Sequence, residues 1–299
     1  MAISSVRAQI NGTWYTLTLS GTNTYTATIT APGTTSFNRT GGYYDVTVEA
    51  TNTAGTTITQ NASGLASLKL VVREKVAPVI TILSPTSGAA VTNNKQPVTF
   101  TIVDEAGGSG INLSSLVVKQ DNTAVAASTI ASTAITNGYS VTYTPASALT
   151  DGSHTVTINV SDNDGNAATA KSTTYKVDTV PPTLNITAPA NALVTNNASL
   201  VVRGTTNDTA SSPVTVKITL AGTDQGSITV GTDGSFSKTL TLANGANTIV
   251  ITATDAAGKT SSVTRTVTLD ISKPVVKSAT ITPNPVDAGA SMVISVVVE

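Results

Sequence analysis

The sequence predicts an all-β protein built of tandem β-sandwiches. Threonine supplies about a fifth of the residues, and such β-branched enrichment favours strands over helices. Apolar and polar residues alternate with period two in segments 24–29, 155–160 and 248–251, and helical periodicity is nearly absent. The alternating segments are separated by turn-forming pairs: Asn11-Gly12, Asp151-Gly152, Asp233-Gly234 and Asn244-Gly245.

Composition excludes several classes of protein. The chain has 299 residues, 39% hydrophobic and 11% charged, with a formal net charge of -1, which is typical neither of a disordered acidic tail nor of a nucleic-acid-binding protein. It has no cysteine, so disulfides, thiolate nucleophiles and cysteine-bound metals are excluded. Residues 1–14 lack a basic patch followed by an apolar core, so we expect no secretory signal, and no apolar run approaches the roughly 18 residues of a membrane span. We therefore expect no membrane insertion and a place in a virion or an extracellular appendage.

Three segments of the chain repeat one another without gaps. They begin at Gly42, Gly152 and Gly245, and each contains alternating apolar positions, an Asn or Asp, and a closing glycine. The intervals are 152 − 42 = 110 and 245 − 152 = 93 residues, the size of one sandwich domain. After each repeat comes another strand-like segment and then a proline: Pro78, Pro182 and Pro274.

With these repeats and prolines, the chain resembles the bacterial immunoglobulin-like domains found in tandem in surface adhesins and phage tail proteins. The resemblance covers essentially the whole chain. It implies that each repeat is strand F, a tight turn and strand G of such a domain, and that each proline opens the next domain. These motifs specify a fold and no activity.

The sequence predicts four segments. Residues 1–76 are an incomplete immunoglobulin-like domain without strands A and B (domain 1). Residues 77–180 and 181–273 are complete domains (domains 2 and 3), in which strand B is expected at residues 98–103 and 200–203. Residues 274–299 are strands A and B with no domain behind them (the terminal hairpin).

The defects of the two ends are complementary. Aligned with domain 3, residues 6–11 match 216–221 and residues 25–29 match 236–240, so domain 1 starts at strand C. Residues 275–299 and 1–74 together contain 25 + 74 = 99 residues, one normal domain. Closure within one chain is strained, because two domains stand between the ends. We expect the hairpin to complete domain 1 of another chain by donor-strand complementation.

The expected assembly residues are apolar positions of the terminal hairpin: Ile281, Met292, Ile294, Val296 and Val298. The expected partners are copies of the same chain or a related immunoglobulin-like virion or surface protein, and repeated contacts give a filament or a ring. Another interpretation stays open, in which the chain is a piece of a longer array.

Candidate chemistry is sparse. His154, the only histidine, occupies the slot of Tyr44 and Asn247, where immunoglobulin-like domains often place a side chain that hydrogen-bonds the corner backbone. With no second histidine or cysteine, no catalytic site can be assembled. We expect no catalytic residue, no organic cofactor and no enzyme activity.

One acidic loop could hold a metal ion. The segment 162–166 reads Asp-Asn-Asp-Gly-Asn, and Asp162 and Asp164, with Asp104 and Glu105 after strand B, could hold an interdomain calcium ion, as in some tandem adhesins that the chain resembles. The alternative is an ordinary Asx turn between two strands. The matching loops of domains 1 and 3 lack the second acid.

Aromatic residues are concentrated in domain 1. Trp14 and Tyr43 mark a surface that could stack against a sugar ring, although either Trp14 or Tyr15 is expected in the core, since adjacent strand residues face opposite sides. The alternative function is therefore an adhesin or a module that binds a host surface glycan.

Overall fold

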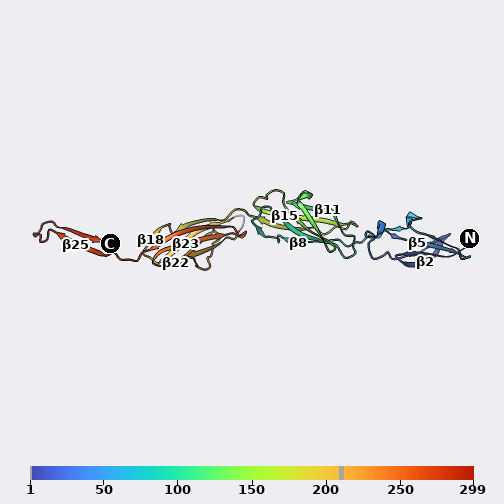
Figure 1. Ribbon diagram of the computed structural model, residues 1–299, viewed down its shortest axis with the longest axis horizontal. Helices are drawn as coiled ribbons and strands as arrows, with labels where there is room; N and C mark the ends of the chain where they lie inside the picture. The colour runs from blue at the N-terminus through green and yellow to red at the C-terminus, as the bar shows by residue number, and fades with distance from the viewer. Residues whose placement is uncertain (1, 209–211) are drawn as a thin grey trace. The chain divides into compact units, whose positions relative to one another are not determined.

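The computed structural model describes residues 2–208 and 212–299 and is all-β apart from three short 3₁₀ turns, Thr40–Gly42, Ala66–Leu68 and Ala127–Thr129 (Figure 1). The predicted all-β class is confirmed. The chain divides into two units, Met1–Thr179 and Val180–Glu299. In the part of the chain that is described, no helix has the length and apolarity needed to cross a membrane.

Domain 1 forms one large sheet. The strand order is β3-β2-β1-β5-β6, and a separate short ladder joins β4 to β7. The strands are β1 (Ile3–Ile10), β2 (Thr13–Gly21), β3 (Thr24–Thr26), β4 (Tyr44–Asp45), β5 (Thr47–Asn52), β6 (Thr57–Gln60) and β7 (Lys69–Leu70). Apart from the β4–β7 ladder, the described residues 2–76 form no second sheet that could pack against the first, as the second sheets of domains 2 and 3 do.

Domain 2 has two sheets around one apolar core. The sheet orders are β13-β14-β10-β8 and β12-β11-β15-β16-β9, and side chains such as Phe100, Ile158 and Val177 are fully buried between them. The strands are β8 (Val79–Ser84), β9 (Ala90–Val91), β10 (Val98–Val103), β11 (Ile111–Gln120), β12 (Thr123–Ala124), β13 (Ile130–Ile135), β14 (Gly138–Tyr143), β15 (Gly152–Asp162) and β16 (Lys171–Val177).

Domain 3, in the second unit, repeats this plan. Its sheets are β17-β19-β22 and β18-β24-β23-β20-β21, and its core includes Val202, Ile218 and Ile251. The strands are β17 (Thr183–Ala188), β18 (Leu193–Thr195), β19 (Ser199–Asn207), β20 (Thr215–Leu220), β21 (Thr223–Asp224), β22 (Ser235–Thr241), β23 (Gly245–Thr254) and β24 (Thr260–Leu269). The expected second strands of domains 2 and 3 correspond to β10 and β19.

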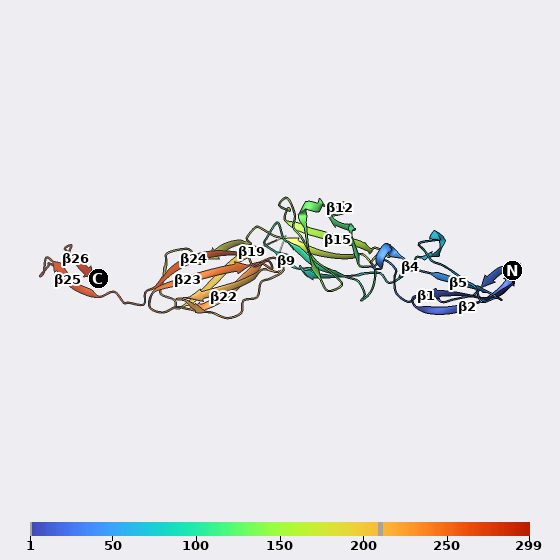
Figure 2. The ribbon, with the colours of Figure 1, turned by 45° about the vertical axis from the view of Figure 1, so that its right-hand side comes forward.

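The terminal hairpin consists of β25 (Val276–Thr282) and β26 (Val293–Val298), drawn in red in Figures 1 and 2. The two strands are antiparallel and form a sheet of their own. Every residue of both strands is exposed. The hairpin therefore buries neither of its faces.

Strand B is the central strand of one sheet in each complete domain. In domain 2, β10 pairs with β8 on one side and β14 on the other. In domain 3, β19 pairs in the same way with β17 and β22. Strands A and E of these sheets thus each pair along one edge with strand B, and in domain 2 strand E also pairs along its other edge with β13.

One predicted strand of domain 1 is only partly formed. The sequence matches residues 25–29 to residues 236–240 of β22, but β3 ends at Thr26 and residues 27–30 are not in a strand. The physical reason is the missing partner: β22 pairs with β19, whereas β3 pairs only with β2. A segment without a neighbouring strand has no ladder to join.

A corner hydrogen bond recurs at the start of strand F. The Tyr44 hydroxyl donates to the Thr34 carbonyl at 3.1 Å. His154 Nε2 donates to the Thr150 carbonyl at 2.8 Å, and Asn247 Nδ2 donates to the carbonyl of Ala243 at the same distance. Three different side chains in one slot therefore tie the strand to the preceding loop, and the role of His154 is structural.

His154 has acceptors on both ring nitrogens. Its Nδ1 lies 2.7 Å from Asp121 Oδ2, and neither this carboxylate nor the Thr150 carbonyl can donate a proton, so both nitrogens carry hydrogen. Burial lowers the pKa of His154, but the hydrogen bonds to Asp121 and Thr150 outweigh it, and the pKa is raised from 6.5. Burial likewise raises the pKa of Asp121, while its bonds to His154 and the Thr155 amide hold it below 3.8.

Replacing His154 with the residue of the matching slot, His154→Asn, should remove a pH-dependent part of the stability of domain 2. The raised pKa of His154 implies a contribution fully present below about pH 6.5 and lost as the pH rises through the folded value. The lowered pKa of Asp121 implies that the contribution is lost again as the pH falls below 3.8. Urea unfolding of both proteins should therefore differ more at about pH 5.5 than at about pH 8.5. An equal difference at both pH values would contradict this assignment.

Candidate functional site

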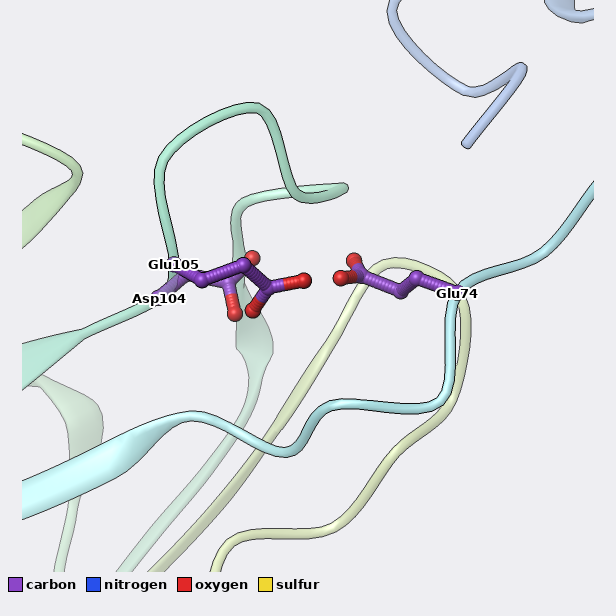
Figure 3. Close-up of side chains that lie close together, drawn as sticks. All are labelled: Glu74, Asp104 and Glu105. Atoms are coloured by element: carbon purple, nitrogen blue, oxygen red, sulfur yellow. The ribbon is translucent and has the colours of Figure 1, made fainter. Parts of the chain in front are cut away.

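An acidic cluster lies where domain 1 leads into domain 2. Asp104 and Glu105 directly follow β10, and Glu74 lies on the segment that joins β7 to β8. One carboxylate oxygen from each of the three lies within 4.8 Å of one from each of the others. Figure 3 shows the Glu74 carboxylate facing those of Asp104 and Glu105. The structure thus brings together two of the predicted metal ligands with one residue that the sequence did not single out.

Three buried oxygens of the cluster have no hydrogen-bond partner among the described residues. Asp104 is only 4% exposed, and its Oδ2 accepts a hydrogen bond from the Gly110 amide at 2.7 Å. Its Oδ1 is buried without a hydrogen-bond partner, as are Oε2 of Glu74 and Oε2 of Glu105. The second oxygen of Glu74, Oε1, accepts from the amide of Ser109. Since buried polar atoms normally have partners, three unsatisfied oxygens in one cluster require an explanation.

The other two predicted ligands, Asp162 and Asp164, lie beside the cluster. Asp162 Oδ1 accepts from the Asn166 amide at 2.8 Å and its Oδ2 from Asn166 Nδ2 at 2.7 Å, so Asp162 forms the turn expected as the alternative. Asp164 Oδ2 accepts from Thr35 Oγ1 at 2.5 Å and from the Glu74 amide at 3.0 Å. Asp164 therefore links domain 2 to two segments of domain 1.

The electrostatic potential at the cluster is negative, because several carboxylates lie close together. Burial raises the pKa of Asp104, the hydrogen bond from the Gly110 amide lowers it, and the neighbouring charges of Glu74, Asp162 and Asp164 raise it further. The net result is a pKa above the usual 3.8. Among the described residues, none of the three clustered carboxylates forms an ion pair with a lysine or an arginine.

The backbone of the loop after β10 closes around these carboxylates. A side chain at Gly108 would meet Asp104 Oδ2 at 2.6 Å and Glu105 Cδ at 2.9 Å. The carbonyl of Gly108 accepts a hydrogen bond from Asn38 Nδ2 of domain 1 at 2.5 Å. The loop is therefore held from both sides of the junction.

A second candidate site is the apolar sheet face of domain 1. Val46, Val48 and Ala50 occupy the repeat slots that are filled in domains 2 and 3 by fully or almost fully buried side chains: Val156, Ile158, Val160, Ile249, Ile251 and Ala253. In domain 1 all three remain partly exposed. Neighbouring Tyr15 and Leu17 of β2 are also only half-buried. Between these two strands, Val6 and Ala8 of β1 are buried on the same face. The face that should be the core of domain 1 is therefore covered along its centre and open along β2 and β5.

The five predicted assembly residues are exposed on the terminal hairpin. Their exposed fractions lie between 45% for Ile281 and 60% for Val298. Ile281 is directly opposite Ile294 across the ladder, and Val296 and Val298 follow Ile294 at intervals of two, so these residues share one face. Met292 directly precedes β26 and is 51% exposed.

The two aromatic residues proposed for a ligand surface lie near cationic side chains. Trp14 is 38% exposed on the face of the sheet opposite Tyr15, with the Arg7 guanidinium carbon 4.2 Å from its ring centroid. Lys69 Nζ lies 4.9 Å from the ring of Tyr43. Arg7 is itself bound to Glu49, with Nε 2.6 Å from Oε2. One face of Trp14 is therefore already covered, and glycan binding stays a prediction.

Two family models match parts of the chain. Residues 84–179 match the family described as bacterial Ig-like domain, and residues 182–271 match glucodextranase, domain B. No curated protein matches the chain significantly.

Several solved structures are similar to parts of the chain at low sequence identity. The fibronectin(III)-like modules of Clostridium thermocellum CbhA are 17% identical, with 64% of this chain and 94% of that chain covered and a TM-score of 0.40. Sidekick-1 immunoglobulin domains 1–5 are 12% identical, with 92% and 55% covered and a TM-score of 0.38. The Bacteroides ovatus protein SGBP-B, solved with a mixed-linkage heptasaccharide, is 15% identical, with 95% and 69% covered and a TM-score of 0.23.

The paired sheets of domains 2 and 3, with their repeated F–G segments, define a protein of tandem immunoglobulin-like sandwiches. Residues 84–179 match the bacterial Ig-like domain family, and the resemblance inferred from the sequence is confirmed. Domains of this kind are typically not catalytic.

Proposed function

We propose that this chain is a non-enzymatic structural protein whose copies join head to tail. The terminal hairpin of one copy completes domain 1 of the next, and repetition of this contact builds a filament or a virion appendage. The observation that carries the proposal is the open core of domain 1, where Val46, Val48 and Ala50 are partly exposed although their repeat partners are buried.

The hairpin has the features that the open face requires. It has the strand pairing of an A–B unit, since β25 pairs with β26 as β8 pairs with β10. In domain 2 the other edge of strand B pairs with strand E, whereas β26 pairs only with β25. Residues 27–29 of domain 1, matched to strand E but not in a strand, could pair with this edge. Such pairing by strand addition satisfies backbone groups on both partners.

Burial of apolar surface supplies the driving force. Each of Ile294, Val296 and Val298 would contribute about 1.5–3 kcal/mol on full burial, before the costs of ordering and association. An isolated two-stranded hairpin is at best marginally stable in water, and an unpaired edge strand readily pairs with another chain. The exposed hairpin and the open sheet therefore each gain from the contact.

A charge on the inner face of the hairpin should block assembly. In Ile294→Asp the carboxylate would have to be buried without a partner in the completed domain, so the chain should remain monomeric. Val297→Asp is the matched control, because Val297 is equally exposed but lies on the other face of β26, where a charge stays in water. Light scattering over a range of concentrations should show growth of the wild type and Val297→Asp only. A wild type that stays monomeric, or equal behaviour of both variants, would contradict the proposal.

Removal of residues 277–299 should leave a folded monomer that accepts the missing strands in trans. Added peptide 274–299 should raise the melting temperature of domain 1 by several degrees, because it binds the folded state alone. Scanning calorimetry is the measurement, and the same peptide carrying Ile294→Asp is the control. If the two peptides act alike, or neither acts, residues 274–299 are not the strands that domain 1 needs.

A further inference from the structure

The junction between domains 1 and 2 has a feature that strand exchange does not explain. Asp104, nine-tenths or more buried, has an oxygen without a hydrogen-bond partner and lies in a group with Glu74 and Glu105, each of which also has such a buried oxygen among the described residues. Burying three carboxylates together is costly, because each loses hydration and repels the others. A positively charged group among these oxygens would offset that cost.

We propose that Glu74, Asp104 and Glu105 hold a divalent cation of the calcium class. Calcium prefers oxygen ligands at 2.3–2.6 Å, so two oxygens on one ion are separated by at most about 5 Å. One oxygen from each of the three carboxylates lies within 4.8 Å of one from each of the others, which fits this geometry (Figure 3). The further charges of Asp162 and Asp164 beside the cluster strengthen the attraction for a cation.

Protein cations do not fill this role. Arg73 and Lys75 flank Glu74 in the sequence, but both are exposed, and the described residues contain no ion pair from either to the cluster. The hydrogen bonds that the cluster does receive, from the amides of Ser109 and Gly110, reach the opposite oxygens of Glu74 and Asp104. Each of the three carboxylates therefore keeps one oxygen that a metal ion could take.

The bound ion would fasten domain 1 to domain 2. Glu74 belongs to the connecting segment, whereas Asp104 and Glu105 belong to the loop that ends β10. The same connection is already supported by the Glu74 amide on Asp164 and by Asn38 on Gly108. An ion that bridges the two sides removes the repulsion between them, so cation binding should stabilise the docked junction.

The test is a calcium titration of the intact chain after treatment with a chelator. Isothermal titration calorimetry with CaCl₂ should show saturable binding with a dissociation constant on the order of 10⁻⁴–10⁻³ M or tighter. The melting temperature of the transition of residues 1–179 should rise by several degrees in CaCl₂. Asp104→Asn should bind calcium about tenfold more weakly or worse and lose that rise.

The melting temperature of Asp104→Asn without calcium distinguishes a metal site from a purely structural role of Asp104. Asp104→Asn removes one of the repelling charges, so without calcium its melting temperature should equal or exceed that of the wild type. Should Asp104→Asn fail to fold, Glu105→Gln makes the same comparison. Asp287→Asn, an exposed acid of the hairpin loop, should keep the full calcium response. No binding, an undiminished response of the Asp104 or Glu105 variant, or equal binding of MgCl₂ would overturn the proposal.

Discussion

Strand B is the part of the sandwich on which the rest depends. Within one sheet of domains 2 and 3 it pairs with strand A on one side and strand E on the other, and its inward side chains, such as Phe100 and Val202, are fully buried. The described residues of domain 1 contain no strand B, and the effect on the domain is visible. Its C–F–G sheet forms, but its apolar face is not sealed, and only residues 25–26 of the segment matched to strand E lie in a strand.

Much of this architecture is predictable from the sequence, because the information is local and repeated. Alternating residues identify the strands, and the repeats at Gly42, Gly152 and Gly245 place strand F in all three domains. The corner role of His154 also follows from its slot. The partial loss of strand structure at residues 27–29 does not follow from local pattern, since alternation indicates the capacity to form a strand but not the presence of a partner.

The acidic cluster was only half predictable for a related reason. Asp104 and Glu105 are adjacent and end a strand, and Asp162 and Asp164 form a conspicuous loop, so both pairs can be found by inspection. Glu74 stands alone on a connecting segment between Arg73 and Lys75, where its charge is balanced in the sequence. Only the fold of the connection turns its carboxylate toward Asp104. Its position shortly before Pro78, at the start of the next domain, was the one available signal.

The central claim is that the open sheet of domain 1 and the exposed hairpin are two halves of one sandwich. Amide hydrogen exchange on the intact chain, at a concentration where it assembles, tests this most directly. The account predicts slow exchange for residues 27–29 and for those amides of β26 that point away from β25, because each set then pairs with the other. Rapid exchange of both sets in the assembled protein would show that the subunits are joined in some other way.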